Sequence, residues 1–195
     1  MGKVTARIAS VGAMVKAYFF DLAVNGLLAS YLVPVHLRNF IFLCWTKGRV
    51  RGAIFGHCYV ESSKLHLGKG SYINRSCMVC NKADWIEIGR CCSIAYGVAM
   101  HTTDHEYSNP LKRAGKVRGG KISIGDGCWI GADAVILPGV EIGPGSIIAA
   151  GSVVTAGRYE SNCLYGGIPA RLIKRLDEDD SKKKRSADRA VGDRG

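Results

Sequence analysis

The sequence lacks an apolar run long enough to cross a lipid bilayer. One uncharged stretch, from Leu22 to Leu37, is sixteen residues long and is interrupted by Asn25, Gly26 and Pro34. A membrane-spanning helix needs about 20 consecutive, mainly apolar residues. We therefore expect no transmembrane helix here. The stretch instead predicts N-terminal amphipathic helices that lie on the fold or on a membrane surface.

Acidic residues are also scarce at this end of the chain. Residues 1–60 contain seven Lys or Arg against Asp21 alone, which gives this region +6 of the formal net charge of +11. Such a segment favours anionic surroundings. In residues 177–195, by contrast, the acids of DEDD balance the bases of KKKR and no aromatic residue intervenes. This composition predicts a disordered, solvated tail and argues against a nucleic-acid patch.

What the sequence has in abundance is a period of six. An aliphatic residue or methionine occupies every sixth position in three runs, and a three-residue slip at 82–84 separates the first two. The positions are Leu67, Ile73 and Val79, then Ile88, Ile94 and Met100, then Ile124, Ile130, Ile136, Ile142, Ile148 and Val154. This period fits neither an amphipathic helix nor a lone surface strand. Three hexads, each a short strand and a turn, predict one triangular coil of a parallel β-helix.

The cysteines follow the same period. Four residues after most of these aliphatic positions stands a small residue, as an inward corner position requires. The set is Ser71, Cys77, Cys92, Val98, Cys128, Ala134, Val140, Ser146 and Ser152. Three cysteines are thus predicted to be core residues. Cys77 and Cys80 form an isolated CxxC whose thiols strand alternation separates, so we expect free thiols in a reducing compartment and no zinc site.

Three segments, MHTTDH, IGDGCWIGADAVILPGVEIGPGSIIAAGSVVT and GGIPARLIKR, resemble the hexapeptide-repeat acyltransferases, and among them the maltose, galactoside and colanic-acid O-acetyltransferases. The resemblance covers residues 52–175. It implies an all-β fold, a left-handed parallel β-helix with N-terminal helices and a short C-terminal helix. It also implies a homotrimer that binds acetyl-CoA in the groove between neighbouring copies. The implied activity is metal-free O-acetylation of a sugar or surface polysaccharide.

The family's catalytic histidine ends a Thr-x-x-His segment, which Thr102 to His105 matches here. An alcohol attacks a thioester poorly unless a base takes its proton, and a positioned base contributes about 10² to 10⁴ in rate. His105 also stands where residues 104–121 leave the six-residue period, and long excursions from repeat arrays are commonly functional. We expect His105 to be the general base and His101 to be structural. The alternative is a loop histidine bonded to backbone.

The resemblance also assigns the acceptor site. Asn74, in the segment Tyr72-Ile73-Asn74, matches an asparagine that faces the acceptor, and its alternative is an ordinary turn residue. Asp84 is the candidate for an acidic residue that contacts the sugar, although it follows the slip in the period. The identity of the acceptor is open for that reason.

For coenzyme A, the resemblance points to residues late in the repeats. Trp129 and Ala132 match positions beside the pantetheine arm, where the Ala132 amide N–H binds the cofactor or the thioester oxygen. Ala150 matches a second backbone contact. Arg171 and Lys174 match basic residues near the nucleotide phosphates, which suit cations for reasons of charge.

Three rival hypotheses remain open. A γ-type carbonic anhydrase would hold zinc on His66, His101 and His105, but the 35 residues between the first two fall one short of two coils. A non-catalytic β-helix scaffold would have no use for the Thr-x-x-His segment. An antibiotic acetyltransferase shares the fold and the base, so a drug acceptor is possible.

These features divide the chain into three parts. Residues 1–51 form an amphipathic helical segment, residues 52–175 the β-helix domain with its C-terminal extension, and residues 176–195 the charged tail. We expect a cytoplasmic protein that contacts the inner membrane face peripherally through its first part.

Overall fold

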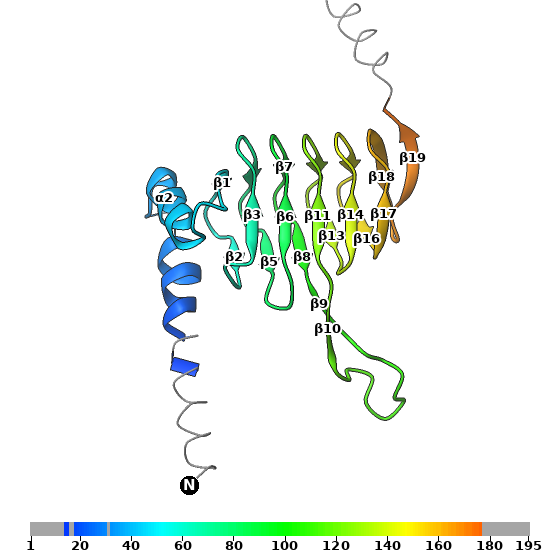
Figure 1. Cartoon of the computed structure of the whole chain (residues 1–195), viewed down its shortest axis with the longest axis horizontal. Helices are drawn as coiled ribbons and strands as arrows, with labels where there is room; N and C mark the ends of the chain where they lie inside the picture. The colour runs from blue at the N-terminus through cyan, green and yellow to red at the C-terminus, as the bar shows by residue number, and fades with distance from the viewer. Residues whose placement is uncertain (1–13, 16–17, 31, 177–195) are drawn as a thin grey trace, which may run out of the picture.

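In the computed structural model, which describes residues 14–15, 18–30 and 32–176, three parallel sheets enclose one apolar core and form a three-sided β-helix (Figure 1). Each coil gives one strand to each sheet in turn. The first sheet contains β3 (Leu65–Leu67), β6 (Ile86–Ile88), β11 (Ile122–Ile124), β14 (Val140–Ile142) and β17 (Gly157–Tyr159). The second sheet contains β1 (Ala53–Ile54), β4 (Tyr72–Ile73), β7 (Ser93–Ile94), β12 (Trp129–Ile130), β15 (Ile147–Ile148), β18 (Cys163–Gly166) and β19 (Arg171–Arg175). The third sheet contains β2 (Tyr59–Val60), β5 (Met78–Cys80), β8 (Ala99–His101), β13 (Val135–Ile136) and β16 (Val153–Val154).

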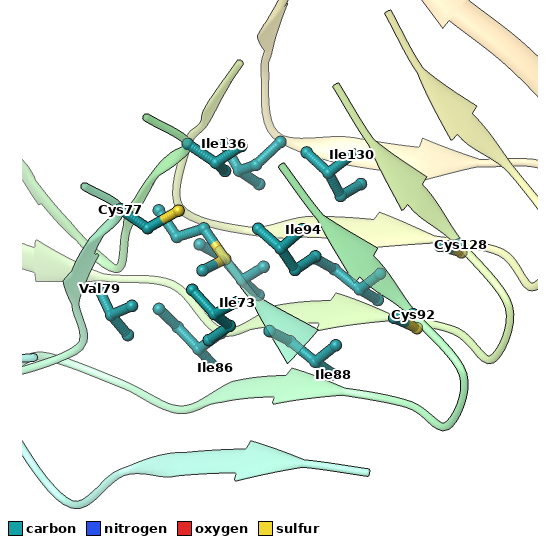
Figure 2. Close-up of a cluster of buried hydrophobic side chains, with 14 of the residues drawn as sticks. Ile73, Cys77, Val79, Ile86, Ile88, Cys92, Ile94, Cys128, Ile130 and Ile136 are labelled. Atoms are coloured by element: carbon teal, nitrogen blue, oxygen red, sulfur yellow. The ribbon is translucent and has the colours of Figure 1, made fainter. Parts of the chain in front are cut away.

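The residues at the six-residue period form the core of the fold. All twelve aliphatic or methionine positions that define it are at most 3% exposed. In the second sheet, for example, Ile73, Ile94 and Ile130 are consecutive partners in register, and their side chains point into the interior (Figure 2). Burying one such side chain contributes about 1.5–3 kcal/mol. The predicted parallel β-helix is confirmed, while its left-handed sense stays a prediction.

The corner positions are buried as well. Cys77, Cys92 and Cys128 are at most 1% exposed, and each thiol lies within hydrogen-bonding distance of a carbonyl of the next coil. The pKa of Cys77 is raised, first by its hydrogen bond with the Cys58 thiol and then by burial. Cys80 is only half-buried, one strand position beyond an inward valine. All eight cysteines are free thiols, as predicted.

The slip at 82–84 is a wider turn that leads from β5 to β6. Asn81, which is fully buried, ties this turn to the turn of the preceding coil: its side chain accepts the Ser62 N–H at 2.8 Å and donates to the Ser62 carbonyl at 2.9 Å. A buried amide bonded on both sides replaces the missing apolar contact. The coil therefore absorbs the extra residues without breaking the sheets.

The predicted excursion is a β-hairpin. After β8 the chain continues into β9 (Thr103–His105), turns, returns along β10 (Val117–Gly119) and rejoins the core at Ile122. β9 and β10 pair only with each other and project from the β-helix (Figure 1). The hairpin leaves the corner between the third and first sheets.

The N-terminal part contains the π-helical segment η1 (Leu22–Leu28) and helix α2 (Val35–Trp45). These helices cover the β1 end of the β-helix (Figure 1). Among the residues that the structure describes, no helix has the length and apolar character needed to span a membrane. The prediction of N-terminal helices is confirmed.

The prediction of a short C-terminal helix is wrong for the described chain. After β18 the segment 167–170 turns back, and β19 runs antiparallel to β18 through residue 175. Leu172 and Ile173 are adjacent and are flanked by basic residues, and this segment completes the second sheet instead of leaving it. The tail beyond residue 176 lies outside the described residues.

Candidate active site

The Thr-x-x-His segment joins the β-helix to the hairpin. Thr102 is fully buried; its hydroxyl donates to the Cys80 carbonyl at 3.1 Å and accepts the Asp84 N–H at 3.2 Å. Three residues later His105 is exposed on β9, paired in register with Val117. The threonine thus anchors the strand that carries the histidine away from the coil.

The imidazole of His105 is held by a backbone carbonyl. Its Nδ1 lies 3.1 Å from the Gly115 oxygen, which can only accept a hydrogen bond. This contact places a proton on Nδ1, so that in the neutral imidazole Nε2 is the nitrogen that can accept a proton. Gly115 is itself fixed, because its N–H donates to the Glu106 carbonyl at 2.8 Å.

An ion pair braces the same hairpin. The Arg118 guanidinium on β10 lies 3.4 Å from the Glu106 carboxylate across the turn. Neither this pair nor the role of Gly115 was predicted from the sequence. The ion pair and the Gly115 contact depend on the register of the hairpin strands. Residues 106–116 contain no sequence repeat from which this register could be predicted.

Asp84 lies at the base of the hairpin, at the corner between the third and first sheets. Its Oδ1 accepts the Trp85 N–H at 2.7 Å, which fixes the side chain at the start of β6. A Cβ added to Gly119, at the end of β10, would lie 3.2 Å from the Ala83 side chain. Asp84 and the hairpin that carries His105 therefore share one corner.

Asn74 lies at a different corner, between the second and third sheets. It follows β4, its N–H donates to the Ile94 carbonyl at 2.9 Å, and its Oδ1 accepts the Arg75 N–H at 2.9 Å. The side chain is half-buried. The structure thus separates Asn74 from His105 of the same chain by the width of the third sheet.

Ala132 and Ala150 occupy the same corner as Asn74, on later coils. Their coils stack closely: the Gly151 N–H donates to the Ala132 carbonyl at 2.8 Å, and a Cβ on Gly131 would lie 2.5 Å from the Ala150 nitrogen. Glycine at 131 is required by this approach. Within the described ranges, the amide N–H groups of Ala132 and Ala150 have no hydrogen-bond acceptor. They are available to a ligand, which fits the backbone contacts expected for coenzyme A.

Trp129, Arg171 and Lys174 lie on the outer face of the second sheet. Trp129 is 54% exposed and heads a row that continues through Ile147 and Leu164 to Lys174. Arg171 is on the same side of β19, opposite Gly166. An exposed indole followed by two cations suits a ligand with a flat or apolar part and an anionic end.

The predicted site residues therefore form two groups within one chain. His105 and Asp84 lie at the corner between the third and first sheets. The other group lies at the corner between the second and third sheets or on the second sheet. It comprises Asn74, Trp129, Ala132, Ala150, Arg171 and Lys174.

The histidines proposed for a zinc site are also separated. His66 is on β3 of the first sheet, whereas His101 is on β8 of the third sheet beside Cys80. One chain cannot bring them to a common ion. In the described part of the chain, no three His, Cys, Asp or Glu side chains are grouped to hold a metal.

Comparison with known proteins agrees with this architecture. Residues 121–156 match the family model for the bacterial transferase hexapeptide, six repeats. The chain is 34% identical over 118 residues to galactoside O-acetyltransferase of Escherichia coli, covering 60% of this chain and 57% of the relative. The chain spans about half the length of the curated relatives it matches.

Solved structures extend the likeness to most of the fold. A maltose O-acetyltransferase from Clostridium difficile superposes with a TM-score of 0.74 at 27% identity, covering 85% of this chain and 89% of that chain. A hexapeptide-repeat acetyltransferase from Vibrio cholerae, solved with acetyl coenzyme A, gives 0.58 at 29% identity over 63% of this chain and 66% of that chain. The predicted resemblance to the hexapeptide-repeat acetyltransferases is confirmed.

Proposed function

We propose that this protein is an acetyl-CoA-dependent O-acetyltransferase that acetylates a hydroxyl of a sugar or surface polysaccharide. The observation that carries the proposal is the His105 ring, which is exposed and whose Nδ1 is occupied by the Gly115 carbonyl. A neutral imidazole fixed in this tautomer is a general base. The solved relative with acetyl coenzyme A supports the choice of donor.

In this mechanism His105 Nε2 accepts the proton of the acceptor hydroxyl as its oxygen attacks the thioester carbonyl. The Ala132 amide N–H donates to the thioester oxygen, on which negative charge develops. His105 then returns the proton to the departing thiolate, so that free CoA and the acetyl ester are formed. Trp129 contacts the pantetheine arm, and Arg171 and Lys174 pair with the phosphates.

The two groups of site residues support a homotrimer. If three copies turn their third sheets toward a common axis, the two corners that flank this sheet meet corner to corner around the ring. His105 and Asp84 of one copy then face Asn74, Ala132 and Ala150 of the next. A site of this kind is incomplete in a single chain.

The outer faces of the sheets agree with that arrangement. On the third sheet the outward strand residues are mainly apolar, namely Tyr59, Met78, Cys80, Ala99, Val135 and Val153, and His101 is the polar exception. On the first sheet they are mostly charged or polar, namely His66, Glu87, Ser123, Glu141 and Arg158. The third sheet is therefore suited to contact with another copy and the first to water.

The acceptor can be tested directly. Purified protein is incubated with acetyl-CoA and a panel of hexoses, amino sugars, polysaccharide fragments and hydroxylated antibiotics, and free CoA is measured. We expect CoA release when a sugar hydroxyl is the acceptor, and we expect His105→Ala to abolish this release. Turnover only with an antibiotic, or only at an amine, would replace the proposed acceptor. Failure of the purified protein to bind CoA at all would favour the scaffold. The eight free thiols fit the cytoplasm, where they remain reduced.

A further inference from the structure

The N-terminal helices carry apolar side chains on their outer side. We call this set the N-terminal apolar surface; its members are between 46% and 91% exposed. They are Met14, Val15, Tyr18, Phe19, Leu22, Leu27, Leu32, Leu37 and Phe40. Soluble monomers rarely gather so many exposed large apolar groups in one region. The surface therefore predicts a partner.

The inner side of the same helices already has its own partners. Phe20, Val24 and Leu28 recur at a spacing of four residues and pack against the core, and the Phe20 and Trp45 ring centroids are 5.1 Å apart. The helices cannot rotate to bury the outer side chains without exposing these inner ones. The N-terminal apolar surface is therefore separate from the core.

Arg38 holds the two helices in this orientation. It is 4% exposed, and its guanidinium donates to the carbonyls of Leu28, Ser30 and Val33 in the connection between η1 and α2. A buried cation that satisfies three carbonyls fixes the connection. Leu37 and Phe40, on the opposite side of α2, are held toward solvent as a result.

Positive charge follows the N-terminal helices directly in the chain. Lys47, Arg49 and Arg51 follow α2 directly and are exposed, whereas Asp21 is the only acid in residues 1–60. Arg49 is also fixed, with its guanidinium 5.1 Å from the Trp85 ring. The charge complements an anionic partner. It opposes contact with a second copy of the same surface, which would bring like charges together.

We propose that the N-terminal apolar surface docks on the anionic face of a lipid bilayer and inserts its apolar side chains in the plane of the interface. Helices that combine exposed Phe, Leu and Tyr with nearby Lys and Arg bind anionic membranes in this way. The helices lie on the bilayer and do not cross it. This inference is independent of the proposed acetyl transfer.

The test uses the full-length protein and cosedimentation with vesicles. One preparation contains phosphatidylcholine alone and the other equal parts of phosphatidylcholine and phosphatidylglycerol. We expect binding to the anionic vesicles only, weakened by added salt because surface charge is screened. Phe19→Ser combined with Phe40→Ser should lower vesicle affinity at least about tenfold, since two aromatic insertions are lost.

Matched variants separate docking from general effects. Tyr96→Ser removes an exposed aromatic group elsewhere and should bind like the wild type. Lys47→Glu should weaken binding at least about fivefold, the effect of losing one cation at an anionic surface, whereas Lys69→Glu, at a residue that is also exposed, should not. Circular dichroism and thermal unfolding verify that each variant is folded.

Three results would overturn the inference. The first is wild-type protein that ignores anionic vesicles. The second is a folded Phe19/Phe40 variant that binds them as tightly as the wild type. The third concerns sedimentation without lipid. If the wild-type protein then forms a larger assembly than the Phe19/Phe40 variant, the surface mediates contact between copies.

Discussion

The coils and the hairpin of this protein follow opposite rules. In the coils nearly every inward position is apolar and at most a few per cent exposed, and each strand pairs with the matching strand of the coil before it. In the hairpin, from 103 to 119, most residues are exposed and the contacts are polar. The coils provide stability and place their corners; the hairpin holds one imidazole. Substitutions in the two regions should therefore have separable effects.

The largest effect is expected where a coil face contacts another copy. Val135→Lys places a cation on the apolar outer face of the third sheet, and an uncompensated charge buried at an interface costs about 3–5 kcal/mol. We expect the trimer to dissociate while each copy stays folded. Analytical ultracentrifugation measures this. Ser123→Lys on the first sheet is the matched control and should remain trimeric. A wild-type monomer at micromolar concentration would refute the shared site.

The next effect concerns the interior of a coil. Ile130→Ala removes a fully buried side chain between Ile94 and Ile148. Substitutions of this type lower the free energy of unfolding by about 2–5 kcal/mol. Chemical denaturation provides the measurement. The activity per folded molecule should be preserved, and a loss of activity without a loss of stability would show that the coil interior contributes to catalysis.

The hairpin should show the reverse. His105→Ala is expected to lower kcat at least about 10²-fold with CoA affinity nearly unchanged, because the proton is transferred only in the transition state. Its thermal unfolding should match the wild type, since the ring is exposed. His101→Ala is the control and should retain most activity. Equal losses from both substitutions, with stoichiometric zinc in active protein, would instead favour a metal site.

How far the sequence predicts the structure also differs between the two regions. The six-residue period correctly predicts which side chains point inward, such as Ile73, Ile94 and Ile130. It does so because consecutive coils with the same sequence pattern adopt the same structure. The excursion was located by the point where the period stops. Its internal contacts, such as Gly115 with His105, depend on hairpin register, which no repeat encodes.

The corners and the C-terminus show a second limit. A period of six does not tell which corner holds Asn74 and which holds His105, since this depends on how three sheets close. The family resemblance implied a short C-terminal helix, but a short basic segment with apolar residues can equally form a strand where a sheet edge is available. The edge of β18 decides it. The roles of the site residues stay predictions.

The smallest effects compare two ion pairs that lie close in sequence. Arg118 pairs with Glu106 inside the hairpin at 3.4 Å, and Lys121 pairs with Glu87 on the first sheet at 2.7 Å. Exposed pairs of this kind contribute about 0.2–1 kcal/mol. Arg118→Gln should reduce kcat by up to about fivefold, because the hairpin that positions His105 loses its brace, and should lower the free energy of unfolding by no more than about 1 kcal/mol.

Lys121→Ala should change neither activity nor, by more than about 0.5 kcal/mol, the free energy of unfolding. Its partner Glu87 is in the middle of a parallel sheet whose backbone pairing with β3 and β11 is independent of the ion pair, and both side chains are 46% exposed. Water replaces the lost contact at little free-energy cost. Steady-state kinetics and denaturation on both variants make the comparison. If Lys121→Ala impaired kcat as strongly as Arg118→Gln, the coil residues at the base of the hairpin would also contribute to catalysis. The functional region would then extend beyond residue 119 into the coil.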